Sequence, residues 1–343
     1  MRSGTRRDQI FPVLDPQVVI PSAVTVEEFI RFFEEPVEAF LRHRRVYIED
    51  IEEAKPIREM LEASHLDRWK MRDRIFSLLL DQAARKITAA QLRQLEEDAR
   101  DRFLREGLVH EGPAGVSFIR DQVDVARTLF NALKNGTGVV GTVPADVSVS
   151  YDAHGVTQTL LITGSVYFNG QNVVWPRIGS FRGKHAVALL VLNAIVKHKG
   201  VSHPCVFAAL KGDNVELKGL ANQPAWMDQN NVLPPLEVLA RLWHIGLQLP
   251  LPLFPEAAGE SFGLARNLNA APYVPDAAEE FNKPDFGFGG GEGNEASVRA
   301  AFRGVDPLRS SQSGSTGPNE SDFVGIARFL AGLDTDPFPG GTI

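Results

Sequence analysis

The sequence predicts an α/β protein of the α+β type, in which a layer of helices precedes a sheet built around one buried helix. Three observations support this prediction. Residues 24–134 carry helix-capping signals and apolar residues at helical spacing. Residues 147–176 are rich in β-branched and aromatic residues, which favour strands. Residues 184–196 are mostly apolar and too numerous for an ordinary strand, so they indicate a buried helix.

The same signals divide the chain into five regions. Prolines at positions 12, 16 and 21 mark an extended lead-in, and segments 286–293 and 310–317 have the glycine- or serine-rich composition of flexible linkers. The regions are an extended lead-in (1–23), a helical layer (24–140), a sheet and helix core (141–255), an irregular C-terminal extension with short helices (256–333) and a disordered tail (334–343).

The first predicted helix has a well-defined start. Thr25 and Glu28 have the spacing of a capping box, which satisfies two free backbone donors of the first turn. Pro36 either kinks this helix or begins a second one. The apolar face that we expect in the core consists of Phe29, Ile30, Phe33, Val37, Phe40 and Leu41. Cations that suit the negative end of a helix dipole close the element: Arg42, His43, Arg44 and Arg45.

Three further helices are predicted before the sheet, over residues 66–84, 88–106 and 113–134. Thr88 and Gln91 form a second capping box at the start of the middle one. In the helix over residues 66–84, the side chains expected to face inward are those of Trp69, Ile75, Phe76 and Leu79.

The sheet is predicted to begin at residue 147. Strands are expected over 147–151, 157–163, 165–168, from 173 onward and over 204–210, with turns at 152–155 and 169–172. Weaker signals predict an edge strand over 215–218 and helices over 236–246, 296–302 and 322–333.

Composition limits the class of protein. The chain has 343 residues, 43% of them hydrophobic, and a formal net charge of -7. Its longest apolar run, residues 186–196, is well short of the ~20 residues that cross a bilayer, and no hydrophobic signal segment follows the charged start. We therefore expect a cytoplasmic protein with no membrane partner. The single cysteine, Cys205, excludes an internal disulfide and a four-cysteine iron–sulfur cluster.

Acidic residues are unevenly distributed along the chain. Residues 153–212 contain no aspartate or glutamate, but they contain six lysines and arginines and four histidines. This asymmetry is typical of a protein with one side that faces nucleic acid. A buried sheet and helix with no room for carboxylates explains it equally well, so both interpretations remain open.

The predicted order of strand, turn, strand, helix and strand is the layout of the core of two-metal nucleases. Nucleases of the PD-(D/E)xK type carry one aspartate on the first strand of this pair, and an acid with a lysine two residues on along the second. These acids hold the divalent cations. This chain instead has Ser165, Val166 and Tyr167 at the first place and Trp175, Pro176 and Arg177 at the second. The expectation is a restriction-endonuclease-like core that lacks catalytic acids and binds no metal.

Three stretches carry a resemblance to a known family: residues 26–42 (VEEFIRFFEEPVEAFLR), residues 177–185 (RIGSFRGKH) with the helix that follows, and residues 242–255 (LWHIGLQLPLPLFP). In order and spacing they resemble the C-terminal, nuclease-like domain of the gamma chain of exodeoxyribonuclease V, the RecC subunit of the RecBCD helicase-nuclease. The resemblance covers roughly residues 12–330. The family's chains are much longer, so Met1 is expected to open a fragment or a split gene product.

The resemblance implies a role for the chain. In this family the gamma chain holds the beta (RecB-like) helicase-nuclease and the alpha (RecD-like) helicase together, and helps to split duplex DNA during recombination and repair of double-strand breaks. It implies a chain that is no enzyme by itself, within an ATP-dependent exodeoxyribonuclease complex. The chain would bind no cofactor, and the partner subunits would use ATP and Mg²⁺.

Candidate DNA-binding residues gather where the sheet leads into the buried helix. A helix start and cations together favour a phosphate, and aromatic residues beside them can stack on bases. The expected DNA-binding residues are Arg177, Arg182, Lys184, His185, Lys197 and Lys199, which no acid of the stretch neutralises, and the possible base-stacking residues are Trp175 and Phe181. Alternatively, these aromatic residues belong to the core and the cations are merely solvated.

Other chemistries have weaker support. The glycine-rich residues 287–293 lack the lysine and serine or threonine of a phosphate-binding loop, and His198, His203 and Cys205 lack a second ligand pair for zinc. An active metal-dependent nuclease would have to use Asp146 or Asp152 with Asp213. A protein-protein scaffold without DNA contact is the remaining alternative.

Overall fold

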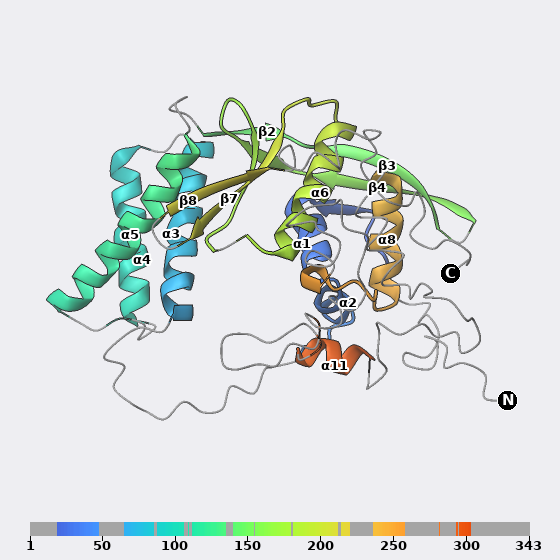
Figure 1. Ribbon diagram of the computed structural model, residues 1–343, viewed down its shortest axis with the longest axis horizontal. Helices are drawn as coiled ribbons and strands as arrows, with labels where there is room; N and C mark the ends of the chain where they lie inside the picture. Colours follow the sequence, from blue (N-terminus) through green and yellow to red (C-terminus); the bar gives the residue numbers. More distant parts are fainter. Residues whose placement is uncertain are drawn as a thin grey trace.

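Two β-sheets and the helices packed on them make up the described part of the chain (Figure 1). The structure is a computed structural model, and it describes residues 19–47, 65–85, 88–105, 109, 112–134, 140–153, 155–179, 181–211, 214–219, 236–257, 281, 293 and 295–302. Helices and strands are both well represented, which confirms the predicted α+β class.

The N-terminal elements follow the local sequence signals. Strand β1 (Ala23–Thr25) leads into α1 (Val26–Glu34), and α2 (Pro36–His43) comes directly after it. The predicted capping box is confirmed, because Thr25 Oγ1 accepts from the Glu28 N–H at 3.1 Å and Glu28 Oε2 accepts from the Thr25 N–H at 3.1 Å. Pro36 begins a second helix, the second of the two alternatives above. All six residues of the predicted apolar face are buried.

The helical layer consists of α3 (His65–Arg85), α4 (Ala89–Arg105) and α5 (Pro113–Leu133), which lie side by side at one end of the molecule (Figure 1). The capping box of Thr88 and Gln91 is confirmed by their reciprocal hydrogen bonds. Ile75, Phe76 and Leu79 are buried as expected. The prediction for Trp69 was wrong, because its side chain is 43% exposed.

One sheet has three strands in the order β1-β4-β3. Strands β3 (Val147–Ala153) and β4 (Val156–Thr163) pair antiparallel over their whole length, and β1 pairs parallel with β4. Side chains of β3 alternate between buried and exposed, as a strand with one covered face requires. Helix α8 (Leu236–Gln248) packs against β3 and covers that face.

The other sheet has five strands in the order β2-β5-β6-β7-β8. The strands are β2 (Gly141–Pro144), β5 (Ser165–Phe168), β6 (Val173–Pro176), β7 (Cys205–Lys211) and β8 (Asn214–Gly219). β6 and β7 are parallel, and the buried helix α6 (Gly183–His198) connects them. Such a connection must cross from one end of the sheet to the other, which explains the helix between the two strands.

A single predicted sheet is therefore split into two. Only Gly164 separates β4 from β5, yet the two strands belong to different sheets. Gly164 has a φ of 132°, a conformation open to glycine and unfavourable for other residues, so the chain can turn out of one sheet and into the other. Sequence pattern alone identified both strands but not this change of sheet.

Both faces of the five-stranded sheet are covered. Trp175 and Phe207 point to the hydrophobic core that contains α1 and α6, whereas Val174 and Ala208 point to the core of the helical layer. This alternation is the two-residue period of a strand. As a result, the loop after β6 lies where α1, α3 and α6 meet.

The C-terminal extension contributes to the main core. Helix α11 (Ala296–Phe302), at the predicted position, packs against α2, and Phe254 contacts the rings of Phe281 and Phe302. The predicted helix over 322–333, the two linker segments and the predicted tail lie outside the described residues, apart from Gly293. In the part of the chain that the structure describes, no helix combines the length and apolar character needed to span a membrane.

Candidate functional site

The loop between β6 and α6 carries most of the predicted site residues. Arg177 follows the last residue of β6, and its backbone N–H donates to the Ala208 carbonyl of β7 at 3.1 Å, which extends the sheet by one bond. Arg182 is the N-cap of α6, and its backbone N–H donates to His185 Nδ1 at 3.0 Å. The imidazole of His185 in turn stacks on Phe207, with ring centroids 4.5 Å apart. His185 therefore caps the helix and faces the core.

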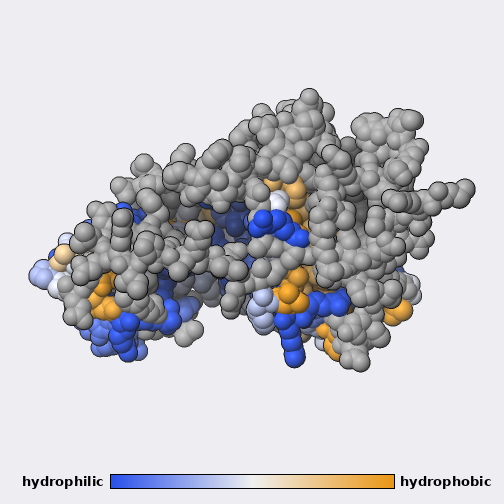
Figure 2. All heavy atoms as spheres, turned by 90° about the horizontal axis from the view of Figure 1, so that it is seen from below, coloured by the Kyte–Doolittle hydropathy of each residue, from blue (hydrophilic) through white to orange (hydrophobic). Residues whose placement is uncertain are grey.

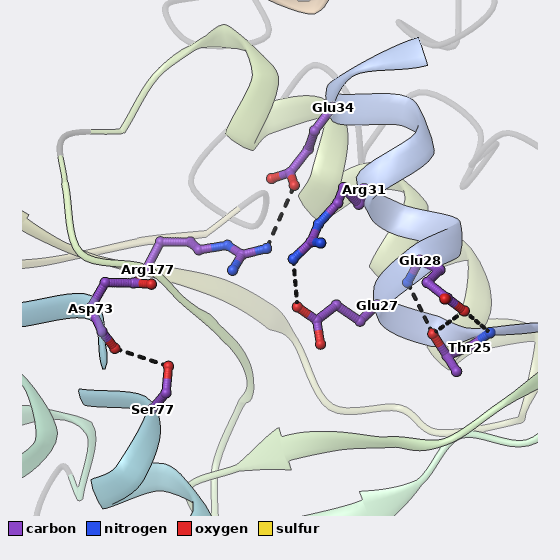
Figure 3. A network of polar contacts seen from close by, with 8 residues as sticks. All are labelled: Thr25, Glu27, Glu28, Arg31, Glu34, Asp73, Ser77 and Arg177. Carbon is purple, nitrogen blue, oxygen red and sulfur yellow. Dashed lines mark hydrogen bonds and ion pairs between the residues drawn. The ribbon is translucent and has the colours of Figure 1, made fainter. Parts of the chain in front are cut away.

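Arg177 forms an ion pair with a buried carboxylate. Its Nη2 atom lies 3.6 Å from Glu34 Oε2 at the end of α1 (Figure 3). Its guanidinium also lies over the Trp175 ring, 4.9 Å from the centroid. Burial raises the pKa of Glu34, while the charges of Arg177 and Lys184 lower it in part. The Trp175 indole N–H also lowers this pKa, although it makes no hydrogen bond of standard geometry among the described residues.

A second acid approaches the same arginine from the helical layer. Arg177 lies between Glu34 of α1 and Asp73 of α3 (Figure 3). Burial raises the pKa of Asp73, and the charge of Arg177 lowers it in part. The exposed pair of Arg31 with Glu27, 3.0 Å apart, lies beside them on α1. Arg177 is thus an electrostatic link between two helices that belong to different hydrophobic cores.

The carboxylate of Glu256, a residue that follows α8, lies at the first turn of α6. The Glu256 carboxylate accepts from the backbone N–H groups of Gly183 and Lys184, the position in which an anion binds at a helix N-terminus. Burial raises the pKa of Glu256, and the charges of Lys184 and Arg182 lower it in part. The predicted phosphate position is therefore taken by a side chain of the protein itself.

Two more acids surround Lys184. Its ammonium group lies 3.8 Å from Oε1 of Glu35, the residue between α1 and α2. Glu295, which precedes α11, also faces this lysine: burial raises the pKa of Glu295, and the charge of Lys184 lowers it in part. Residues 153–212 contain no acid, but in the folded chain other elements bring carboxylates to their cations. The absence of acids from this stretch therefore does not produce an acid-free surface.

The six predicted DNA-binding residues do not form one surface. At a rise of about 1.5 Å per residue, Arg182 and Lys197 lie roughly 20 Å apart along α6. Lys197 is exposed, and Lys199 Nζ donates to the Asp146 carbonyl at 2.9 Å. Arg177 and Lys184 form ion pairs, and His185 packs against Phe207. Of the six, Arg182, Lys197 and Lys199 are exposed cations for which the described residues show no ion pair with a carboxylate.

The aromatic residues agree with the alternative that places them in the core. Trp175 is only 8% exposed, and Arg177 covers one face of its ring. Phe181 is half-buried against Phe207, at a centroid distance of 5.2 Å. In this structure the Trp175 ring is a core side chain, so base stacking by Trp175 would need the fold to open.

The acids of the nuclease alternative are engaged in turns. Asp146 Oδ1 accepts from the Gly164 N–H at 2.8 Å, and Asp152 Oδ1 accepts from the Gly155 N–H at 3.0 Å. Asp213 lies outside the described residues. Within the described ranges, no three histidine, cysteine, aspartate or glutamate residues are placed to hold a metal ion.

The loop between β6 and α6 lies where α1, α3 and α6 meet, and we call this place the junction. The sequence did not predict the acids that reach it. One signal for Glu34 was present, because it lies four residues after Ile30 and therefore on the apolar stripe of α1. A carboxylate on such a stripe is buried and needs a partner. Asp73, Glu256 and Glu295 carry no comparable local signal, since their relation to α6 depends on tertiary packing.

The fold and the site together define a mixed α/β protein whose layers meet at a buried, charge-balanced junction. The sequence matches the family model of the RecC C-terminal domain over residues 21–262. The chain belongs to this family, which connects it to the RecBCD-type complexes of DNA repair. A comparison with curated proteins finds no match.

Proposed function

We propose that this chain is the non-catalytic, nuclease-like part of a RecC-like subunit, and that it holds helicase and nuclease subunits together in a RecBCD-type complex. The family match supports the assignment to such a complex. The predicted partners are a beta (RecB-like) and an alpha (RecD-like) subunit, which would use ATP and Mg²⁺.

One observation carries the non-catalytic part of this proposal. On the strand where a nuclease would place its second acid and its lysine, this chain has Trp175 and Arg177, and the guanidinium pairs with Glu34. Trp175, which stands where the second acid would be, offers no oxygen ligand to a hard divalent cation. The arginine instead serves to join α1, α3 and the sheet.

DNA contact is the second part of the proposal, and it rests on fewer residues than the sequence indicated. Arg182 and Lys197 are exposed, and Arg182 lies at the edge of the junction. Phosphate binding by exposed cations releases counterions and depends on salt. Arg177 and Lys184 pair with Glu34 and Glu35, so these two cations contribute to the fold and their charge is not free to bind a phosphate.

The test is assembly with purified partners. The full chain is mixed with the RecB-like and RecD-like subunits of the same organism, and the mixture is separated by size-exclusion chromatography. The three chains are expected to elute together. A double variant, Arg182→Glu with Lys197→Glu, serves as a control that should keep assembly and weaken DNA binding. Separate elution of a correctly folded wild-type chain from both subunits would refute the assembly role.

A further inference from the structure

Trp69 is an exposed tryptophan that the described core does not use. Its side chain is 43% exposed, whereas Trp175 and Trp243 are 8% and 3% exposed. We propose that Trp69 and the cations beside it on α3 form a stacking site for the bases of single-stranded DNA. This inference rests on the DNA-contact part of the proposed function and assigns to it a residue that sequence reasoning had placed in the core.

The Trp69 ring is held in a fixed orientation. Its Nε1 atom donates to the Ile178 carbonyl at 2.6 Å, in the loop that leads from β6 to α6. The same nitrogen lies 3.8 Å from the place where a Cβ of Gly179 would be. One edge of the indole is thus anchored, so a base that stacks on the exposed part meets a ring that has already lost its rotational freedom. Pre-organisation of this kind lowers the entropic cost of binding.

The charges around Trp69 suit a polyanion. Lys70 and Arg74 are exposed and lie one helical turn apart on α3. Arg68 and Arg72 are half-buried beside α5, where Arg68 lies over the Phe118 ring and Arg72 donates to Gln122. From residue 68 to residue 81 the helix carries four cations and two acids, and one of these acids, Asp73, faces Arg177.

The surroundings favour a nucleic acid over a protein partner. A tryptophan that anchors a protein interface normally lies in a well-packed pocket, surrounded by contacts that exclude water. Trp69 is instead 43% exposed, with Arg72 and Asp73 one helical turn away and Lys70 next to it along the chain. On the face shown in Figure 2, the coloured, described residues are mostly hydrophilic, and their hydrophobic atoms form small separate patches. Aromatic rings interleaved with cations are the combination that binds single strands, whose bases are free to stack.

The experiment measures binding of a fluorescent oligothymidine and of a matched duplex by the full chain, using fluorescence anisotropy. Trp69→Ala should weaken oligothymidine binding by about 5- to 150-fold, the range expected for one lost base stack, and should change duplex binding much less. Trp69→Phe removes the hydrogen bond to Ile178 but keeps an aromatic face, so it should restore most of the affinity. Leu161→Ala is the control, because Leu161 is also 43% exposed but lies on β4.

The outcomes separate this site from the assembly role. No oligothymidine binding by the wild-type chain, or equal affinity of the Trp69→Ala variant, overturns the stacking site. A Trp69→Phe variant as weak as Trp69→Ala also overturns it, because the indole hydrogen bond would then explain the loss. Loss of partner binding by Trp69→Ala with unchanged DNA affinity would identify a protein contact instead. Failure of the wild-type chain to bind its partners tests the proposed assembly alone.

Discussion

The backbone of Gly183 lies directly against that of Glu256: a Cβ atom on Gly183 would be 2.7 Å from the Glu256 carbonyl oxygen and 2.8 Å from that of Pro255. Only a glycine allows the segment after α8 to approach the first turn of α6 this closely. The contact brings the Glu256 carboxylate to the backbone N–H groups of α6 and fixes the C-terminal segment on the core.

The first prediction concerns this contact. Gly183→Ala should lower the free energy of unfolding by roughly 1–3 kcal/mol, the usual cost of overpacking, because backbone atoms cannot move aside as a flexible side chain can. This result is opposite in sign to the gain of ~1 kcal/mol that alanine gives over glycine in an unconstrained helix. Urea denaturation followed by circular dichroism measures it. Gly141→Ala is the matched control, since a Cβ on Gly141 meets no atom within 4 Å. A stabilised Gly183→Ala variant would contradict the close approach.

The second prediction concerns the ion pair of Arg177 and Glu34. Arg177→Ala leaves the Glu34 carboxylate buried without its partner and should cost roughly 2 kcal/mol, less than the 3–5 kcal/mol of a fully buried pair, because the Arg177 side chain is 28% exposed. Arg177→Ala in a Glu34→Gln background should cost less, which a double-mutant cycle measures. Arg31→Ala, at an exposed pair, should change stability by less than about 1 kcal/mol. Additive effects of the two substitutions would show that the pair is not coupled.

The third prediction concerns pH. Burial raises the pKa values of Glu34, Glu256 and Glu295 above the ordinary value of 4.5. Between pH 4.5 and these raised values, the folded chain therefore binds more protons than the unfolded chain. Their contribution to stability is complete below pH 4.5 and is lost as the pH rises through the raised, folded-state values. Glu256→Gln should therefore flatten the fall of unfolding free energy above pH 4.5.

Denaturation at a series of pH values measures this slope, with Glu97→Gln on α4 as a control for loss of an exposed charge. An unchanged slope in Glu256→Gln would show that the carboxyl group titrates equally in the folded and unfolded chain.

The fourth prediction is that the purified chain cleaves neither linear duplex nor single-stranded DNA with Mg²⁺ or Mn²⁺. Residues 153–212, which include both places that would hold the metal ions, contain no carboxylate to bind a hard cation. Gel assays of labelled DNA over time provide the measurement. Metal-dependent cleavage that co-purifies with the chain and disappears in Asp152→Ala would restore the nuclease alternative.

Elements determined by local signals were predicted well. The two capping boxes and the run of apolar residues in α6 act within a few residues of each other, so the sequence locates them directly. Strand β1 was missed, because its three residues become a strand only by pairing with β4. The change of sheet at Gly164 was missed for the same reason.

The sequence indicated the cations of the loop after β6, but not the acids that meet them in the fold. Three acids from other parts of the fold lie beside the cations of the loop from Arg177 to Lys184. They are Glu34, Asp73 and Glu256. For Trp175 on β6 the core alternative holds, whereas Trp69, expected to face inward, lies to one side of the buried stripe of α3. That stripe consists of Met71, Ile75, Phe76, Leu79 and Leu80. Helical spacing alone does not show which side of a stripe a neighbouring helix will cover.

The aromatic contacts of Phe254 have a consequence for how far the folding unit extends. The match to the RecC C-terminal domain ends at residue 262, yet Phe281 and Phe302 lie 4.6 and 5.7 Å from the Phe254 ring and belong to the same core. A chain shortened to the family boundary would leave the Phe254 ring and the α2 surface without their cover. The minimal fragment for expression therefore has to reach at least the end of α11, forty residues beyond the point at which similarity to the family ends.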